Sequence, residues 1–230
     1  ITKSYGMYIT GDLTINSGKI HAYSTQEALS YDGADKEACC ECYGIYVMKN
    51  AIAGDMIVNG GTVVAEGTPN IDAKSTGDSA IGVSGGIFVQ NRLTINDGDV
   101  TAKGAESITV SGKSGKVNKA SSVGVALKHL AVNGGSLSAN SKKACDNTAG
   151  DHQSYGIWSY NTFSSDGIDA SITISGGSVH ATSGGMAVSA NSLSLADGVT
   201  AQVSTDMDGT GPIDYTSNTK LDKYKWFSAH

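Results

Sequence analysis

The stretch Leu13-Thr-Ile-Asn-Ser-Gly-Lys-Ile-His-Ala22 reads as a short strand, a glycine turn and a second short strand. Apolar and polar residues alternate on both sides of the turn, which is typical of β-strands with one buried face. The phrase returns at Met56–Ala65, Leu93–Ala102, Leu130–Ala139, Ile172–Ala181 and Leu193–Ala201, the last copy being one residue short. Such self-similarity predicts a repeat architecture in which each unit buries its apolar face against its neighbours.

A third alternating run precedes each copy and begins at a glycine, as in Gly44-Ile-Tyr-Val47 and Gly86-Ile-Phe-Val89. Three strands per repeat predict an all-β, single-stranded parallel β-helix, and parallel crossovers favour the right-handed form. We therefore expect a right-handed solenoid of about six coils over residues 1–203. The turn glycines suit backbone positions with φ above zero. They are Gly18, Gly61, Gly98, Gly135, Gly177 and Gly198.

Alternation also assigns the faces of the strands. Residues such as Leu13, Ile15 and Leu93 should point inward, and equivalent residues of successive coils should stack about 4.8 Å apart. The third strand of each repeat ends inward on alanine, as at Ala22 and Ala201, which suggests a tight corner. We expect these alanines to lie directly over one another.

The C-terminal segment leaves this pattern. Residues 204–230 are expected to form a loop and an aromatic cap within the same domain, because terminal coils carry unpaired strand edges that need covering. The N-terminus starts inside the first coil without a comparable cap, and this favours a fragment of a longer precursor.

Composition excludes several classes of partner. The formal net charge is −6 and Arg92 is the single arginine, so nucleic acid is not an expected partner. No apolar run approaches the roughly 18 residues of a membrane span, and no run in the given residues has the pattern of a signal peptide. The exterior, rich in Ser, Thr, Asn and Gly, favours a secreted or cell-surface protein, as a monomer or weak oligomer.

Three of the four cysteines, Cys39, Cys40 and Cys42, lie in the segment inserted in the first repeat, which we expect to be a loop. Cys145 lies in a distant loop. One loop disulfide, free thiols and a metal site are the three alternatives, and the spacing does not give the two pairs of a typical zinc site.

The outward positions of the first strand form an aromatic ladder, which continues through Ala126 to Ala187. The four aromatic members, Tyr8, Tyr46, Phe88 and Trp158, are the candidate ligand-binding residues. Exposed rings at the coil spacing suit the stacking of sugar rings or the binding of a surface protein. The alternative is that loops 23–42, 66–85 and 140–154 cover the rings, which then only extend the core.

No catalytic residues are assigned. The outward positions of the predicted strands carry no Asp, Glu, Lys or Arg, whereas a glycosidase needs two carboxylates about 5–10 Å apart. We therefore expect a non-catalytic module that binds a glycan or a surface protein. The alternatives are a β-helix polysaccharide lyase or glycosidase, and a purely structural or adhesive repeat domain.

No cofactor is expected, with calcium as the one metal to consider. Asp206, Asp208 and Asp214 offer carboxylate ligands in one loop, but an EF-hand register would place Tyr215 where the bidentate glutamate belongs.

On these motifs, residues 5–203 resemble the parallel β-helix repeat proteins of clostridial and other Gram-positive gut bacteria. Their coils read approximately as Gly-Ile-x-x, then Leu-Thr-Ile-x-Gly-Gly-x-Val-x-Ala. That family is similar to secreted carbohydrate-binding β-helix domains, some of which bind acidic plant polysaccharide with calcium. The resemblance implies a bacterial surface protein that binds carbohydrate. This chain departs from the calcium-binding members, because its turns carry Ser17, Gly60 and Gly134 in place of regular acidic residues.

Overall fold

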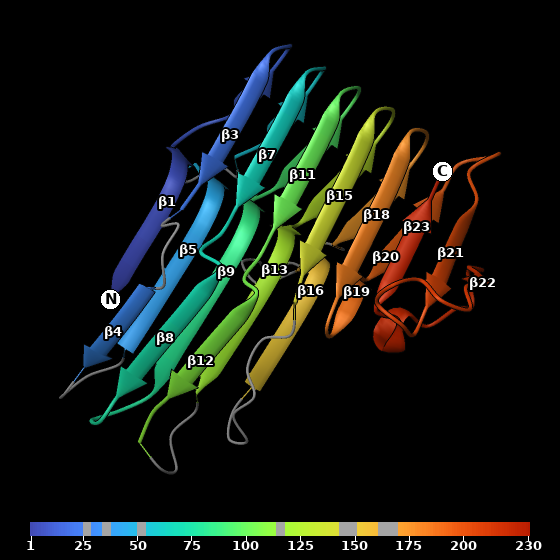
Figure 1. The fold of residues 1–230 in the computed structure, drawn as a ribbon. Coiled ribbons are helices and arrows are strands. Elements are labelled where there is room, and N and C mark those ends of the chain that lie inside the picture. Colours follow the sequence, from blue (N-terminus) through green and yellow to red (C-terminus); the bar gives the residue numbers. More distant parts are fainter. Residues whose placement is uncertain (25–28, 34–37, 50–53, 114–117, 143–150, 161–169) are drawn as a thin grey trace.

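The structure, a computed structural model, is an all-β solenoid of stacked parallel strands (Figure 1). It describes residues 1–24, 29–33, 38–49, 54–113, 118–142, 151–160 and 170–230. The three strands of each predicted repeat fall into three different sheets, here called A, B and C. Within each sheet the repeats follow one another in chain order, so the predicted β-solenoid is confirmed.

Sheet A contains β1 (Thr2–Ile9), β5 (Ala38–Val47), β9 (Ala80–Val89), β13 (Lys119–Leu127), β16 (Asp151–Ser159) and β19 (Met186–Ser189). Sheet B contains β2 (Leu13–Ile15), β6 (Met56–Val58), β10 (Arg92–Ile95), β14 (His129–Val132), β17 (Ser171–Ile174) and β20 (Ser192–Leu195). Sheet C begins with the parallel strands β3 (Lys19–Tyr23), β7 (Thr62–Glu66), β11 (Asp99–Lys103), β15 (Ser136–Ser141) and β18 (Ser178–Ser183).

The register of these sheets stacks equivalent core residues. Leu13 pairs with Met56 and Met56 with Leu93. The same column continues through Leu130, Ile172 and Leu193. Within the column Met56 and Leu93 are fully buried, as the alternation predicts. The main core is therefore a set of apolar columns along the solenoid axis.

The turn between sheets B and C is fixed by two repeated residues. The six turn glycines all have positive φ, between 66° and 93°, as predicted. Next to them, exposed asparagines form a hydrogen-bonded chain in which Asn59 Nδ2 donates to Asn16 Oδ1 at 2.9 Å. Asn96 and Asn133 continue it at 2.8 and 2.9 Å. This chain ties neighbouring coils together outside the core.

A fourth sheet, D, was not predicted. It contains β4 (Leu29–Gly33), β8 (Asn70–Ser75) and β12 (Ser107–Ser111), which extend the first repeats beyond sheets A, B and C (Figure 1). The strands of sheet A that face it are correspondingly long. A second, smaller core lies between them and includes Ile71, Ala73 and Ile108.

The cysteines at 39, 40 and 42 are in this region, in strand β5 and not in a loop. Cys40 and Cys42 are free thiols buried in the smaller core, while Cys39 is half-buried. Burial raises the pKa of Cys40 to about 11 and also raises the pKa of Cys42. Cys145 lies outside the described residues. These two thiols are therefore protonated, apolar packing groups at neutral pH.

The C-terminal end of sheet C differs from the predicted stacking. The order continues from β18 to β23 (Trp226–Ala229), β21 (Ala201–Ser204) and β22 (Ile213–Asp214). Strand β23 is antiparallel to both neighbours, so Ala181 pairs with Phe227 and Ala201 with Ala229. Ala201 therefore does not lie over Ala181. A short 3-10 helix, η1 (Leu221–Lys223), precedes β23.

Candidate functional site

The predicted aromatic ladder lies on the outer face of sheet A. Tyr8 and Tyr46 stack with ring centroids 5.5 Å apart and planes inclined by 15°. Tyr46 and Phe88 stack at 4.4 Å and 11°. The strand register pairs Tyr8 with Tyr46 and Tyr46 with Phe88, so the coil spacing brings these rings together as the alternation predicts.

Trp158 is separated from Phe88 by Ala126, which pairs with both. The ring of Tyr160 fills the space above this alanine, with centroids 5.9 Å from Phe88 and 5.0 Å from Trp158. Sequence reasoning missed Tyr160 because it follows the end of β16, outside the repeated phrase. We call the resulting set of rings the aromatic face. It consists of Tyr8, Tyr46, Phe88, Tyr160 and Trp158.

The ladder does not continue to Ala187, which was expected to point outward. Trp158 pairs with Ser189, and Ala187 is buried in the main core. The cause is a register shift. The repeat aligns Gly156 with Gly185 and would therefore pair Tyr155 with Gly184, but Tyr155 pairs with Met186. The aromatic face therefore ends at Trp158.

Tyr43 lies beside the aromatic face and supports two of its rings. The Tyr43 ring stands edge-on to Tyr46 at 5.3 Å and to Phe88 at 5.6 Å. It lies over Gly85, where an added Cβ would meet the ring at 2.3 Å. Burial, followed by the charge of Glu41, raises the pKa of the Tyr43 phenol, which is fully buried. This support holds the outer rings in fixed orientations.

Exposure varies along the aromatic face. Tyr8 is 48% exposed, Tyr46, Phe88 and Trp158 are half-buried, and Tyr160 is buried. The described parts of loops 23–42 and 66–85 build sheet D and lengthen sheet A instead of covering the rings. Tyr8, Tyr46, Phe88 and Trp158 are thus partly open to solvent.

A small groove of about 280 Å³ lies beside Trp158. Its polar lining includes Glu41, Ser121 and Gln153. The Ser121 hydroxyl is shielded from solvent and has no hydrogen-bond partner among the described residues. Glu41 holds Lys3 in an ion pair at 2.8 Å. An aromatic wall with a few convergent polar groups is typical of a binding site for a small polar ligand.

A second groove, of about 460 Å³, lies where sheet C turns toward sheet D. It is lined in part by Tyr23, Glu66, Lys103 and Glu106. The prediction that outward strand positions carry no charge was wrong here, because β7 and β11 extend one residue past the alanine and present Glu66 and Lys103. We call this the corner groove.

Glu66 is the centre of an ion-pair network in the corner groove. It accepts from Lys103 Nζ at 2.8 Å and contacts His21 Nε2 at 3.3 Å. The hydrogen bond from Lys103 is the main reason that the pKa of Glu66 lies below its usual value. The carboxylate is therefore ionised at neutral pH and poorly suited to donate a proton.

This network makes a testable contribution to acid stability. Because the folded pKa of Glu66 is lowered, its contribution is present above the ordinary glutamate pKa of about 4.3 and is lost as pH falls toward the folded pKa. Glu66→Gln should make the free energy of unfolding less dependent on pH below about pH 4.3. The difference from the unaltered protein should be less than about 1 kcal/mol, because the pair is partly exposed. Urea unfolding at stepped pH measures it. Glu106→Gln, in a more exposed pair with Lys142, is the control, and an equal change in both profiles would contradict this role.

Two of the three carboxylates in the acidic loop are hydrogen-bonded within the fold. Asp208 Oδ1 accepts from the Thr210 amide at 3.0 Å, and this lowers the pKa of Asp208. Asp214 Oδ1 accepts from Gln202 at 3.1 Å. Asp206 is exposed, and its amide donates to Ser204 Oγ. Among the described residues no three His, Cys, Asp or Glu side chains gather in a way that could hold a metal ion, these three aspartates included.

The described part of the chain contains no helix long and apolar enough to cross a membrane. No protein family, curated protein or solved structure matches the chain.

Proposed function

We propose that this chain is a non-catalytic recognition module, secreted or displayed at the cell surface, that binds carbohydrate through the aromatic face. The observation that carries the proposal is the continuous run of ring contacts from Tyr8 to Trp158, in which Tyr8, Tyr46 and Phe88 are stacked and all members except the buried Tyr160 are partly exposed. Sugar rings present apolar C–H faces that pack on aromatic rings, and successive rings add contacts along a chain.

The groove beside Trp158 supplies the polar part of this site. Ser121 has an unused hydroxyl there, and Glu41 and Gln153 add a carboxylate and an amide. Such groups fix the orientation of a ligand whose apolar face lies on Trp158. A protein adhesin would use a wider apolar patch, whereas these polar groups favour a glycan.

No catalytic role is proposed, because the carboxylates of the corner groove are held in ion pairs with lysines. A glycosidase needs one carboxylic acid that is protonated near neutral pH. Glu66 is held ionised by Lys103, and Glu106 lies 3.4 Å from Lys142. This arrangement supports binding over hydrolysis.

The same proposal includes the finer architecture. We infer a right-handed solenoid of about six coils, with residues 204–230 covering the last coil. Six strands in each of sheets A and B support the coil number. The antiparallel strand β23, with Phe227 buried beneath it, supports the cap.

The binding proposal is tested on a glycan array followed by titration with the best ligand. Trp158→Ala and Tyr46→Ala should each weaken binding by about two- to tenfold, the value of an aromatic stacking contact. Tyr8→Ala and Tyr23→Ala form a matched pair, since the two side chains are 48% and 46% exposed and only Tyr8 belongs to the aromatic face. Tyr23→Ala should leave affinity unchanged. Unaltered binding in the Trp158 and Tyr46 variants would reject the aromatic face as the site.

A further inference from the structure

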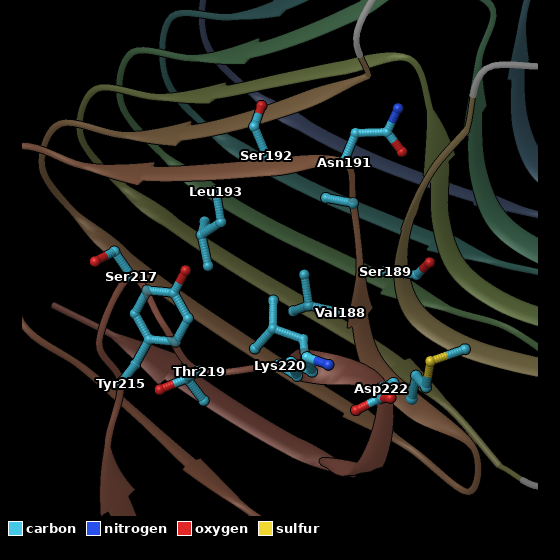
Figure 2. Close-up of a pocket in the computed structure, with 13 residues that line it drawn as sticks. Val188, Ser189, Asn191, Ser192, Leu193, Tyr215, Ser217, Thr219, Lys220 and Asp222 are labelled. Atoms are coloured by element: carbon cyan, nitrogen blue, oxygen red, sulfur yellow. The ribbon is translucent and has the colours of Figure 1, made fainter.

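A pocket of about 560 Å³ opens at the C-terminal end of the solenoid (Figure 2). One side is the corner between β19 and β20, which carries Asn191 and Ser192. The other side is the segment 215–222, here called the strap, which includes Tyr215 and Lys220. We call this cavity the end pocket.

The floor of the end pocket is apolar. Val188 belongs to the main core, and Leu193 packs against that core from its edge. In Figure 2 both side chains lie between the strap and the β19–β20 corner. In the preceding repeat the corresponding residues, Ile157 and Ile172, are almost fully buried by the next coil. At the end pocket no further coil follows, and Leu193 is left partly exposed to the cavity, whereas Val188 stays buried at 2% exposure.

The strap is held in place by the backbone. The Ala187 amide donates to Tyr224 O at 2.7 Å, and the Tyr215 amide donates to Ala201 O at 2.8 Å. The Tyr215 ring also contacts Phe227 edge-on at 6.4 Å. The pocket is therefore a cavity with two anchored walls.

Several polar side chains on these walls are not used by the fold. Within the described residues, no hydrogen bond or ion pair engages the side chains of Asn191, Ser192, Ser217, Lys220 or Asp222. Thr219 differs, because its hydroxyl closes a turn with the Thr216 amide at 3.0 Å. The unused groups combine hydroxyl, amide, ammonium and carboxylate at one cavity.

We propose that the end pocket is a second carbohydrate site, which binds a neutral di- or trisaccharide or the end of a neutral glycan. One cation and one anion, Lys220 and Asp222, give its lining no net charge, so neither an acidic nor a basic sugar is favoured. A carboxylate accepts from two sugar hydroxyls while an ammonium donates to others. Leu193 and the Tyr215 ring, both partly exposed, offer apolar surface to the C–H face of a sugar. The volume is within the range of about 300–1,000 Å³ typical of ligand pockets.

The end pocket is a different site from the aromatic face, although Ser189 of its lining pairs with Trp158 in sheet A. The end pocket contains neither Trp158 nor Tyr46. A different occupant, a β-strand of a second copy, would pair with the edges of β19 and β20, the last strands of sheets A and B. That occupant predicts association without any sugar.

The experiment titrates the protein, followed by NMR or calorimetry, with neutral di- and trisaccharides of glucose, mannose, galactose, xylose and N-acetylglucosamine. Leu193→Trp, which enlarges the side chain that projects from the floor toward the strap in Figure 2, should weaken binding of the best sugar at least about tenfold. Ser194→Trp, on the same strand but on its outward face and outside the pocket, should leave it unchanged. Asp222→Asn gives a milder change that keeps the pocket shape, and binding should fall several-fold.

The outcomes separate the two sites and the two occupants. Binding lost with Trp158→Ala but kept with Leu193→Trp would overturn the end pocket and leave the aromatic face standing. No binding by any of these sugars would overturn the proposal. So would a concentration-dependent dimer, measured by light scattering, that Leu193→Trp abolishes, because the pocket would then be an interface between copies.

Discussion

Gly61→Ala is expected to lower the free energy of unfolding far more than the same change at Gly198. Both glycines have a φ of +87°. In this left-handed conformation any Cβ costs roughly 1–2 kcal/mol. An alanine Cβ at position 61 would also lie 2.4 Å from Gly18 O, whereas at position 198 nothing lies within 4 Å. The backbone pair cannot separate without breaking the stack of coils.

The expected loss is thus about 1–2 kcal/mol for Gly198→Ala. For Gly61→Ala it is above about 4 kcal/mol, a size reached only when strain or packing is severe. Urea unfolding followed by circular dichroism measures both. Gly18→Ala, with φ +93° and no neighbour within 4 Å, is a second control at the N-terminal end. Equal losses at positions 61 and 198 would show that φ alone, and not the close stacking, selects glycine.

These glycines also show why the core of the fold could be predicted from the sequence. Each repeat carries the same alternation and the same turn, so Leu13, Leu93 and Ile172 occupy equivalent positions, and each copy supports the same prediction. Stacking then follows from the spacing alone, because parallel in-register coils place like residues together. The positive φ of the turn follows from the same repetition.

The parts that could not be predicted lie where repetition fails. Sheet D arises in segments outside the repeated phrase. A run such as Asn70–Ser75 therefore had no counterpart in that phrase to identify it as a strand. Tyr160 joins the aromatic face only because Ala126 leaves a space one coil below, which depends on tertiary packing. Glu66 and Lys103 were missed because the strands end one residue later than the alternation suggested.

The C-terminal end shows the same limit. The alanine at position 201 matches the repeat, yet strand β23 lies between it and Ala181. Local pattern gives no information about a later segment that returns in the antiparallel direction. That segment covers the β18 edge, which a further parallel coil would otherwise have paired.

Phe227→Ala is expected to destabilise this end strongly. The Phe227 side chain is 1% exposed and belongs to the main core. Its backbone pairs with Ala181 on one side and Val203 on the other, so the ring anchors the strand that joins β18 to β21. Truncation of a buried phenylalanine costs about 3–5 kcal/mol, from lost burial and from the cavity left behind. Ile213→Ala, at a side chain 52% exposed, should change stability by less than about 0.5 kcal/mol.

The site of the loss can be located as well as its size. The Ser183 amide donates to Lys225 O at 2.9 Å, and the Lys225 amide donates to Ser204 O at 2.9 Å, so both bonds depend on the segment that Phe227 anchors. In Phe227→Ala these amides should lose hydrogen-exchange protection, while that of Asn96, bonded to Val58 O, stays protected. In a solenoid each coil contacts only its neighbours, so damage at the end need not spread to the centre. Uniform loss of protection along the chain would mean that the whole solenoid unfolds as one unit, with the C-terminal segment as part of its cooperative core.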